Sequence, residues 1–288
     1  MSLPAVFDYH PATSVDEALA LLQQYGDDAK LLAGGHSLLP MMKLRLAQPG
    51  HLVDLGKISG LSYIREEDGA IAVGAMTTYT TMENSDLLRR HFAMLAEGIA
   101  VIGDPQVRNR GTIGGSIAHA DPAADMPGMV LALKADILVQ GVNGVRTIKA
   151  DDFFTGTFET ALQPNEIVTE IRFAIPPPHS GSAYMKLENK ASHYAVAGCA
   201  AVVTLDTDGT CTSASVVITG ASAKATRASG VEAVLVGKKL DEPSIAGAAT
   251  HASEGLDVLG DIHGSKAYRG QMAVVMARRA ITRAVERA

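Results

Sequence analysis

The sequence has few of the residues that mark several common classes of protein. It contains two cysteines, Cys199 and Cys211, no tryptophan, and only 5% aromatic residues. A cysteine-ligated iron–sulfur cluster takes four thiolates, so this chain cannot hold such a cluster alone. No Cys-x-x-Cys pair is present either. We therefore expect both cysteines to be buried free thiols that pack as small hydrophobic residues.

Positive charge and long apolar runs are also scarce. The 25 Lys and Arg residues against 31 Asp and Glu residues give a net charge of -6. Because nucleic-acid-binding proteins carry a basic surface, this balance argues against nucleic acid as a partner. No apolar run reaches the roughly 18 residues of a membrane span. The N-terminus, with Pro4 and Asp8, lacks the pattern of a secretory signal. We expect a cytoplasmic protein without a membrane span.

The first 57 residues predict a small parallel α/β unit. Ser14 is placed to cap a helix that ends near Tyr25, with Glu17 completing a capping box. Residues 30–33 and 52–55 read as short buried strands, and residues 37–46 read as a helix between them. Helix, strand, glycine turn, helix and strand in this order are typical of a parallel α/β arrangement.

The pattern changes twice along the remaining chain. Strand-like segments at 61–64 and 70–73 predict a hairpin, and Pro176-Pro177-Pro178 marks a linker. After the linker, three antiparallel strands precede three helices, the last with four arginines largely off its apolar side. We interpret that basic face as solvated, with partner binding as the alternative. The further expected elements are helices at 79–83, 87–102, 129–133, 228–236, 243–255 and 266–287, and strands at 137–140, 145–148, 167–175, 183–187, 195–205 and 210–219.

Two diglycines, Gly34-Gly35 and Gly114-Gly115, are each followed within two positions by a serine. Glycine lets a ligand approach the backbone closely, and successive N–H groups in such a turn can point into one concavity. A helix that starts there adds partial positive charge. Together the two diglycines predict two cradles for one ligand with two linked phosphates. The alternative is that both are only tight turns.

Other site types fit the sequence poorly. Neither diglycine matches a Walker A loop or Gly-x-Gly-x-x-Gly. His119, Asp121 and Asp125 have no zinc-like spacing, and Pro122 breaks any helix that would align them, so we expect them to support a loop. Ser37 resembles a nucleophile elbow, but the following glycine that such an elbow needs is absent.

Taken together, these motifs resemble one known family. Residues 33–37 (Ala-Gly-Gly-His-Ser), 112–116 (Thr-Ile-Gly-Gly-Ser) and 119–125 (His-Ala-Asp-Pro-Ala-Ala-Asp) are similar to the FAD-binding medium subunits of molybdenum hydroxylases, including those of carbon monoxide dehydrogenases. The resemblance runs from residue 7 to about residue 269. It implies an α+β fold of the xanthine dehydrogenase/vanillyl-alcohol oxidase type. Two α/β subdomains, 1–57 and 58–177, would sandwich FAD, and a C-terminal domain, 178–288, would hold a three-stranded antiparallel sheet and helices.

The resemblance also implies which residues contact FAD, and it implies no catalytic side chain. Asp125 would lie toward the adenosine end, Val168 and Lys186 toward the flavin, and Tyr194 beside the isoalloxazine. For Tyr194 the alternative is an ordinary strand residue. Ser116 departs from an asparagine common in the family, and residues 188–190 are less basic than in carbon monoxide dehydrogenases. The implied cofactor contacts are Leu31, Leu32, Ala33, Gly34, Gly35, His36, Ser37, Leu38, Ile102, Thr112, Ile113, Gly114, Gly115, Ser116, Asp125, Val168, Lys186 and Tyr194.

The function implied is that of an electron-transfer subunit. Its expected partners are a large subunit with the molybdenum cofactor and a small subunit with two [2Fe-2S] clusters, from which electrons would reach FAD and then an external acceptor. The alternatives are a stand-alone FAD-dependent oxidoreductase and a nucleotide-binding module without turnover. The substrate of the complex stays open among carbon monoxide, purines, N-heterocycles and aldehydes.

Overall fold

The computed structural model describes residues 3–288 and begins with a three-stranded parallel sheet, in the order β1-β3-β2. The capping box before the first helix is confirmed in part. Ser14 accepts the Glu17 N–H at 3.1 Å. The Glu17 carboxylate, however, accepts from Thr13 at 2.7 Å, one residue earlier than expected. Strand β1 was missed. The elements are β1 (Asp8–Pro11), α1 (Val15–Tyr25), β2 (Ala29–Leu32), α2 (Leu38–Lys43) and β3 (His51–Asp54).

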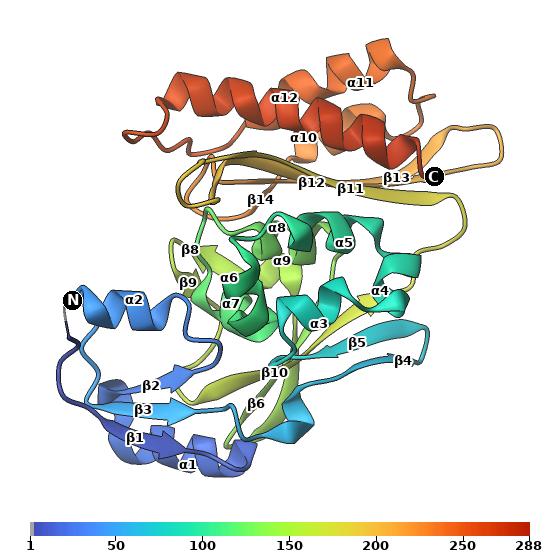
Figure 1. Ribbon diagram of the computed structural model, residues 1–288. Coiled ribbons are helices and arrows are strands. Elements are labelled where there is room, and N and C mark those ends of the chain that lie inside the picture. The colour runs from blue at the N-terminus through green and yellow to red at the C-terminus, as the bar shows by residue number, and fades with distance from the viewer. Residues whose placement is uncertain (1–2) are drawn as a thin grey trace.

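A five-stranded sheet in the order β4-β5-β10-β6-β7 forms the middle of the molecule (Figure 1). The expected first strand at 61–64 is wrong by three residues. Asp68 and Gly69 both have positive φ, 51° and 74°, and form a two-residue hairpin turn that sets the register. The strands are β4 (Ile64–Glu67), β5 (Ala70–Gly74), β6 (Asp136–Gly141), β7 (Gly144–Lys149) and β10 (Glu166–Ala174), with a small separate pair, β8 (Phe154–Gly156) and β9 (Glu159–Thr160).

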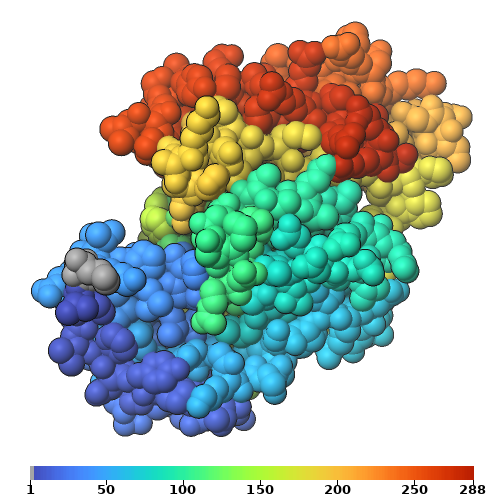
Figure 2. All heavy atoms as spheres, in the orientation of Figure 1, coloured from blue at the N-terminus to red at the C-terminus, as the bar shows by residue number. Residues whose placement is uncertain are grey.

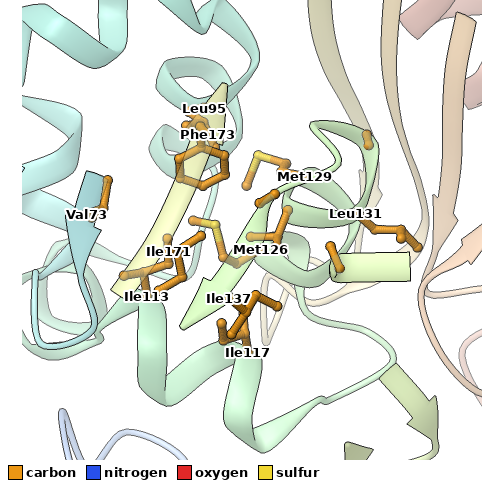
Figure 3. Close-up of a cluster of buried hydrophobic side chains, with 14 of the residues drawn as sticks. Val73, Leu95, Ile113, Ile117, Met126, Met129, Leu131, Ile137, Ile171 and Phe173 are labelled. Atoms are coloured by element: carbon orange, nitrogen blue, oxygen red, sulfur yellow. The ribbon is translucent and has the colours of Figure 1, made fainter. Parts of the chain in front are cut away.

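Short helices cover one face of this sheet. The single helix expected at 87–102 is two helices, because the backbone leaves helical geometry at Phe92, which packs 5.6 Å from Phe173 between ring centroids. Ile113 and Ile117 of α7 meet Met126 of α8 in the core beneath (Figure 3). The helices are α3 (Tyr79–Glu83), α4 (Asp86–His91), α5 (Ala93–Ala100), α6 (Pro105–Arg110), α7 (Ile113–His119), α8 (Asp125–Ala132) and α9 (Ala150–Phe153).

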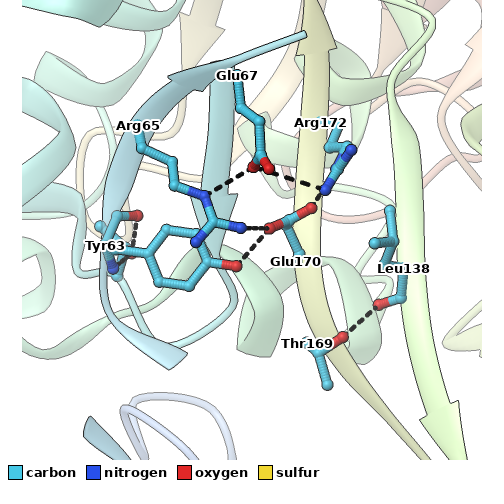
Figure 4. Close-up of polar contacts among 8 residues, drawn as sticks. Tyr63, Arg65, Glu67, Leu138, Thr169, Glu170 and Arg172 are labelled. Carbon is cyan, nitrogen blue, oxygen red and sulfur yellow. Dashed lines mark hydrogen bonds and ion pairs between the residues drawn. The ribbon is translucent and has the colours of Figure 1, made fainter. Parts of the chain in front are cut away.

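The opposite face of the middle sheet carries a charged cluster at Glu170 (Figure 4). Because side chains alternate along a strand, Glu170 points away from the core that Ile171 joins. Glu170 is buried and accepts from the Tyr63 hydroxyl, Arg65 and Arg172. Two effects raise the pKa of Tyr63 to about 12: burial is the larger, and the Glu170 carboxylate is the next. The cluster joins the edge strand β4 to the central strand β10.

The C-terminal part is an antiparallel sheet in the order β11-β12-β13-β14, covered on its outer face by helices (Figure 1). The three expected strands are present, and the short β14 adds a fourth. Cys199 and Cys211 are free and buried, as expected. The elements are β11 (Ser180–Glu188), β12 (Ala195–Leu205), β13 (Cys211–Thr219), β14 (Thr226–Arg227), α10 (Ser229–Leu235), α11 (Glu242–Ala249) and α12 (Lys266–Val285).

Three hydrophobic clusters lie within this architecture, one associated with each large sheet. The N-terminal sheet and the C-terminal helices occupy opposite ends of the molecule, with the middle sheet and its helices between them (Figure 2). The α+β fold class is therefore confirmed. Within residues 3–288, no helix has the length and apolar character needed to cross a membrane.

Candidate functional site

The two glycine loops lie against each other. A Cβ atom on Gly34 would overlap the backbone carbonyl oxygen of Arg110, just before the second loop. A Cβ atom on Gly115 would lie 3.3 Å from the Cβ of Ala33. The structure thus brings together two segments separated by about eighty residues of sequence, as the cradle hypothesis requires. Glycine at position 34 is needed because two backbones pack closely.

The first loop, residues 33–37, presents free backbone donors. None of its five N–H groups, from Ala33 to Ser37, has an acceptor among the described residues. Gly35 has a φ of 76°, the left-handed conformation that glycine adopts at little cost. The His36 ring nitrogen Nδ1 lies 3.1 Å from the Gly34 carbonyl. Successive free N–H groups ahead of α2 leave backbone donors available to an anionic ligand.

The second loop, residues 112–116, differs from this picture. The Ile113 and Gly114 N–H groups donate to the carbonyls of Thr77 and Ala75, at 3.2 and 2.9 Å. The Gly115 N–H donates to the Thr112 hydroxyl at 3.1 Å, which caps α7. The Ser116 N–H donates to the Thr112 carbonyl at 3.1 Å. The prediction that this loop is a backbone N–H cradle is therefore wrong for residues 113–116, because helix formation and packing use their N–H donors.

Gly114 also has a packing role. A Cβ atom at this position would lie 2.7 Å from the Ala75 carbonyl oxygen. Tyr79, which is buried, hydrogen-bonds the Ser116 hydroxyl, and burial raises the pKa of Tyr79 well above its usual value. The second loop is thus fixed against the middle sheet on both sides.

Tyr194 lies where the C-terminal sheet approaches the first loop. It directly precedes β12 and is 41% exposed. Burial raises its pKa, Asp121 raises it further, and a hydrogen bond with the Ser37 hydroxyl lowers it. Its phenol therefore lies within reach of the Ser37 hydroxyl and feels the charge of Asp121. These contacts place Tyr194 among the loops of the candidate site.

Asp125 and Lys186 form a buried pair, with side chains 5% and 3% exposed. One Asp125 oxygen accepts from the Tyr184 hydroxyl at 2.6 Å and the other from Lys186 at 3.0 Å. Lys186 also donates to the carbonyls of Val101 at 2.6 Å and His193 at 2.7 Å. Burial raises the pKa of Asp125 to about 6, although the Lys186 charge lowers it. The pair joins α8, β11 and the segment before Tyr194.

Tyr184 was missed by sequence reasoning. The alternation of side chains along a strand could have indicated it, because residues two apart share a face. Tyr184 lies two residues before Lys186, which is one of the implied cofactor contacts. Tyr184 is buried, and its hydroxyl also lies 3.3 Å from that of Thr219. Burial raises the pKa of the Tyr184 hydroxyl, and the nearby Asp125 carboxylate raises it further. Tyr184 therefore stays protonated and donates to the carboxylate.

The remaining implied contacts fall into two groups. Ile113 and Val168 lie in the core, 0% and 6% exposed. Ile102 packs partly buried against the same core. Leu31, Leu32 and Leu38 are partly buried at the first loop.

His119 and Asp121, whose residue types could suggest a metal site, make contacts that support loops. The Asp121 carboxylate accepts the Ala123 N–H at 2.9 Å. His119 packs 5.0 Å from Phe158 between ring centroids, and burial lowers its pKa against an opposing effect of Asp121. Among residues 3–288 no three potential metal ligands cluster.

Comparison with known proteins agrees with this geometry. A family described as the FAD binding domain in molybdopterin dehydrogenase matches residues 5–178. A second, the CO dehydrogenase flavoprotein C-terminal domain, matches residues 182–284. The carbon monoxide dehydrogenase medium chain of Hydrogenophaga pseudoflava is 44% identical, covering 98% of both chains. The 6-hydroxypseudooxynicotine dehydrogenase complex subunit alpha of Paenarthrobacter nicotinovorans is 39% identical, covering 99% of this chain and 96% of its own.

Solved structures show the same relationship. A chain of carbon monoxide dehydrogenase from Hydrogenophaga pseudoflava superposes with a TM-score of 0.96 at 44% identity, covering 99% of each chain. A chain of quinoline 2-oxidoreductase from Pseudomonas putida 86 gives 0.92 at 33% identity, covering 99% of this chain and 98% of that one. The expected family and the cofactor FAD are thereby confirmed. This chain belongs to the family of FAD-binding medium subunits of molybdenum hydroxylases.

Proposed function

We propose that this chain binds FAD at the junction of its two glycine loops and serves as the electron-transfer subunit of a molybdenum-containing hydroxylase. The observation that carries the site is the run of free N–H groups from Ala33 to Ser37, beside Tyr194. Each hydrogen bond from such a donor to a charged phosphate contributes about 1.5–3 kcal/mol. Bound FAD supplies the redox chemistry, and the protein supplies its position and electrostatic environment.

The residues proposed to hold FAD have distinct roles. The first loop would bind the pyrophosphate through its N–H groups and the Ser37 hydroxyl. The second loop, 112–116, would form the opposite wall through its surface, since the N–H groups of residues 113–116 are already bonded. Tyr194 would lie against the isoalloxazine. Asp125 and Lys186 would hold the walls in place, because both side chains are satisfied within the protein.

The proposed division into 1–57, 58–177 and 178–288 is supported by the three sheets and by the end of the first family match at residue 178. The proposed partners are a large subunit with the molybdenum cofactor and a small subunit with two [2Fe-2S] clusters. Two cysteines on this chain are too few to ligate either cluster. The relatives include a carbon monoxide dehydrogenase medium chain and a subunit of a dehydrogenase complex. A cytoplasmic location is consistent with both cysteines being free.

Introducing a negative charge into the first loop tests the proposed phosphate site. Ser37→Glu should weaken FAD binding to the full chain at least tenfold, about 1.4 kcal/mol. Thr207→Glu, in the exposed turn between β12 and β13, is the matched control and should bind FAD as the unmodified chain does. Titration of flavin fluorescence measures both. Equal affinity of the two variants would refute the placement of the phosphates.

Partner dependence separates the alternatives. An electron-transfer subunit should co-purify with two other chains and should not reduce its own flavin when offered carbon monoxide, an aldehyde or an N-heterocycle alone. A stand-alone oxidoreductase would bleach its flavin absorbance with one of these substrates and no partner. A nucleotide-binding module without turnover would bind FAD but would not accept electrons from the co-purified chains.

A further inference from the structure

The first turn of α12 contains a buried arginine, Arg269, that is 5% exposed. Its Nη1 donates to the carbonyls of Val196 at 2.8 Å and Gly220 at 2.6 Å. Its Nη2 donates to both carboxylate oxygens of Asp261, each at 2.7 Å. Arg269 therefore joins the start of β12, the residue after β13 and the loop before its own helix.

Those strand ends hold the turn that leads into α8. The Ala195 N–H donates to the Ala123 carbonyl at 3.0 Å, and the Gly220 N–H donates to the Pro122 carbonyl at 2.9 Å. Gly220 has a φ of 75°, and a Cβ atom there would overlap the Ala195 carbonyl. The two strand ends and the turn at Pro122 are thus packed closely, and the guanidinium fixes the strand side of this arrangement.

The same segments carry candidate site residues. Tyr194 directly precedes Ala195, and Asp125 lies two residues after Ala123. We propose that Arg269 is a positioning residue for the cofactor site: it sets the placement of Tyr194 and of the turn before Asp125 without touching FAD. This inference rests on the proposed function, because it assumes that FAD lies against Tyr194. Helix α12 lies on the outer side of the C-terminal sheet (Figure 1). Through Arg269 it would influence the cofactor site on the opposite side of that sheet.

The chemistry of this position indicates that Arg269 serves to connect its partners and not to stabilise helix α12. A cation in the first turn of a helix opposes the helix dipole, and burying it carries a desolvation cost that needs several well-placed partners. The planar guanidinium reaches two carbonyls and a carboxylate at once in a fixed geometry, which the point charge of lysine does not reproduce. Its Nε has no partner among the described residues, so the Nη contacts account for its placement.

Arg227 offers a matched control. It lies in the same sheet, and its side chain is 18% exposed. It also links the C-terminal part to the middle part, by donating to the Leu131 carbonyl at 3.0 Å and to Asp151 at 2.8 Å. Leu131 is near the end of α8, whereas Asp125 begins that helix. Loss of Arg227 disturbs the same junction away from Tyr194.

The experiment compares Arg269→Met, Arg269→Lys and Arg227→Met in the full chain. We expect Arg269→Met to raise the Kd for FAD at least tenfold and to shift the visible spectrum of bound FAD. Arg269→Lys should show both effects more weakly. Arg227→Met should lower the thermal midpoint but leave the Kd within twofold and the spectrum unchanged.

Two results would overturn the inference. One is an Arg269→Met protein with unchanged affinity and spectrum, and the other is an equal loss of affinity in Arg227→Met, which would indicate general destabilisation. If Arg269→Met does not fold, Asp261→Asn weakens the same guanidinium contacts and should raise the Kd at least threefold, and an unchanged Kd would count against the role. Failure of the unmodified chain to bind FAD would instead refute the proposed function.

Discussion

Replacing Lys186 by methionine should strongly destabilise the protein at alkaline pH. The variant keeps the aliphatic volume but removes the charge partner of Asp125 and the donor to Val101 and His193. Removing one member of a buried ion pair costs about 3–5 kcal/mol, because the other charge stays buried without compensation. We therefore expect the free energy of unfolding at pH 8 to fall by about that amount.

The pH dependence of this destabilisation shows whether the buried charge of Asp125 causes it. Burial raises the pKa of Asp125 to about 6 in the folded chain, well above the usual range of an aspartate carboxyl. The folded state then binds this proton more tightly, so the Asp125 contribution to stability falls as pH rises from about 4 to above 6. The charge of Lys186 lowers the pKa of Asp125 and thereby limits this loss of stability. At pH 5 the carboxyl is mostly neutral, and Lys186→Met should cost only about 1–3 kcal/mol, for the lost hydrogen bonds.

Urea unfolding followed by circular dichroism measures both values, since the chain has no tryptophan for fluorescence. The double variant Lys186→Met/Asp125→Asn should be less destabilised than the sum of the single variants, with a coupling of about 0.5–3 kcal/mol. A loss below about 1 kcal/mol at pH 8, or the same loss at pH 5 and pH 8, would contradict the reasoning.

Two further substitutions test the packing. Gly34→Ala should lower the unfolding free energy by about 1–3 kcal/mol even without FAD, because its Cβ meets the Arg110 carbonyl. Gly247→Ala, in α11 with open space at that position, should instead be neutral or stabilise by about 0.5–1 kcal/mol; a thermal shift assay that finds both alike would refute the close packing. Tyr63→Phe should cost about 1 kcal/mol, since Glu170 loses one donor and keeps two arginines, and urea titration showing a loss above about 3 kcal/mol would mean that the hydroxyl organises the whole cluster.

Local signals predicted several elements well. The Ser14 cap and α1 follow from contacts within four residues, and the helix at 79–83 was placed without error. The hairpin strand was shifted because apolar residues at 61–64 outweighed Asp68-Gly69 as a turn signal. Helix α7 was missed because two glycines lower its intrinsic propensity. It forms because Thr112 caps it and the core buries its apolar face.

The approach of the two glycine loops was predictable from the sequence, but the way they pack was not. The two glycine loops were expected to meet, and they do. Sequence could not show that Gly34 and Gly114 are needed for protein packing, because the atoms they would strike, at Arg110 and Ala75, are distant in the chain. The pairing of Asp125 with Lys186 likewise depends on elements 61 residues apart.

The strand order of the middle sheet has a consequence for synthesis of the chain. Strand β10 is the last of its five strands in sequence yet lies at the centre, paired with both β5 and β6. Until Ala174 leaves the ribosome, the facing edges of those two strands have no partner. At about 5–20 residues per second, the interval from the completion of β5 is on the order of 5–20 s. During that time the edge of β5, joined by that of β6 once Gly141 has been added, is exposed to other nascent chains, so this protein should depend on chaperones most while its middle third is being made.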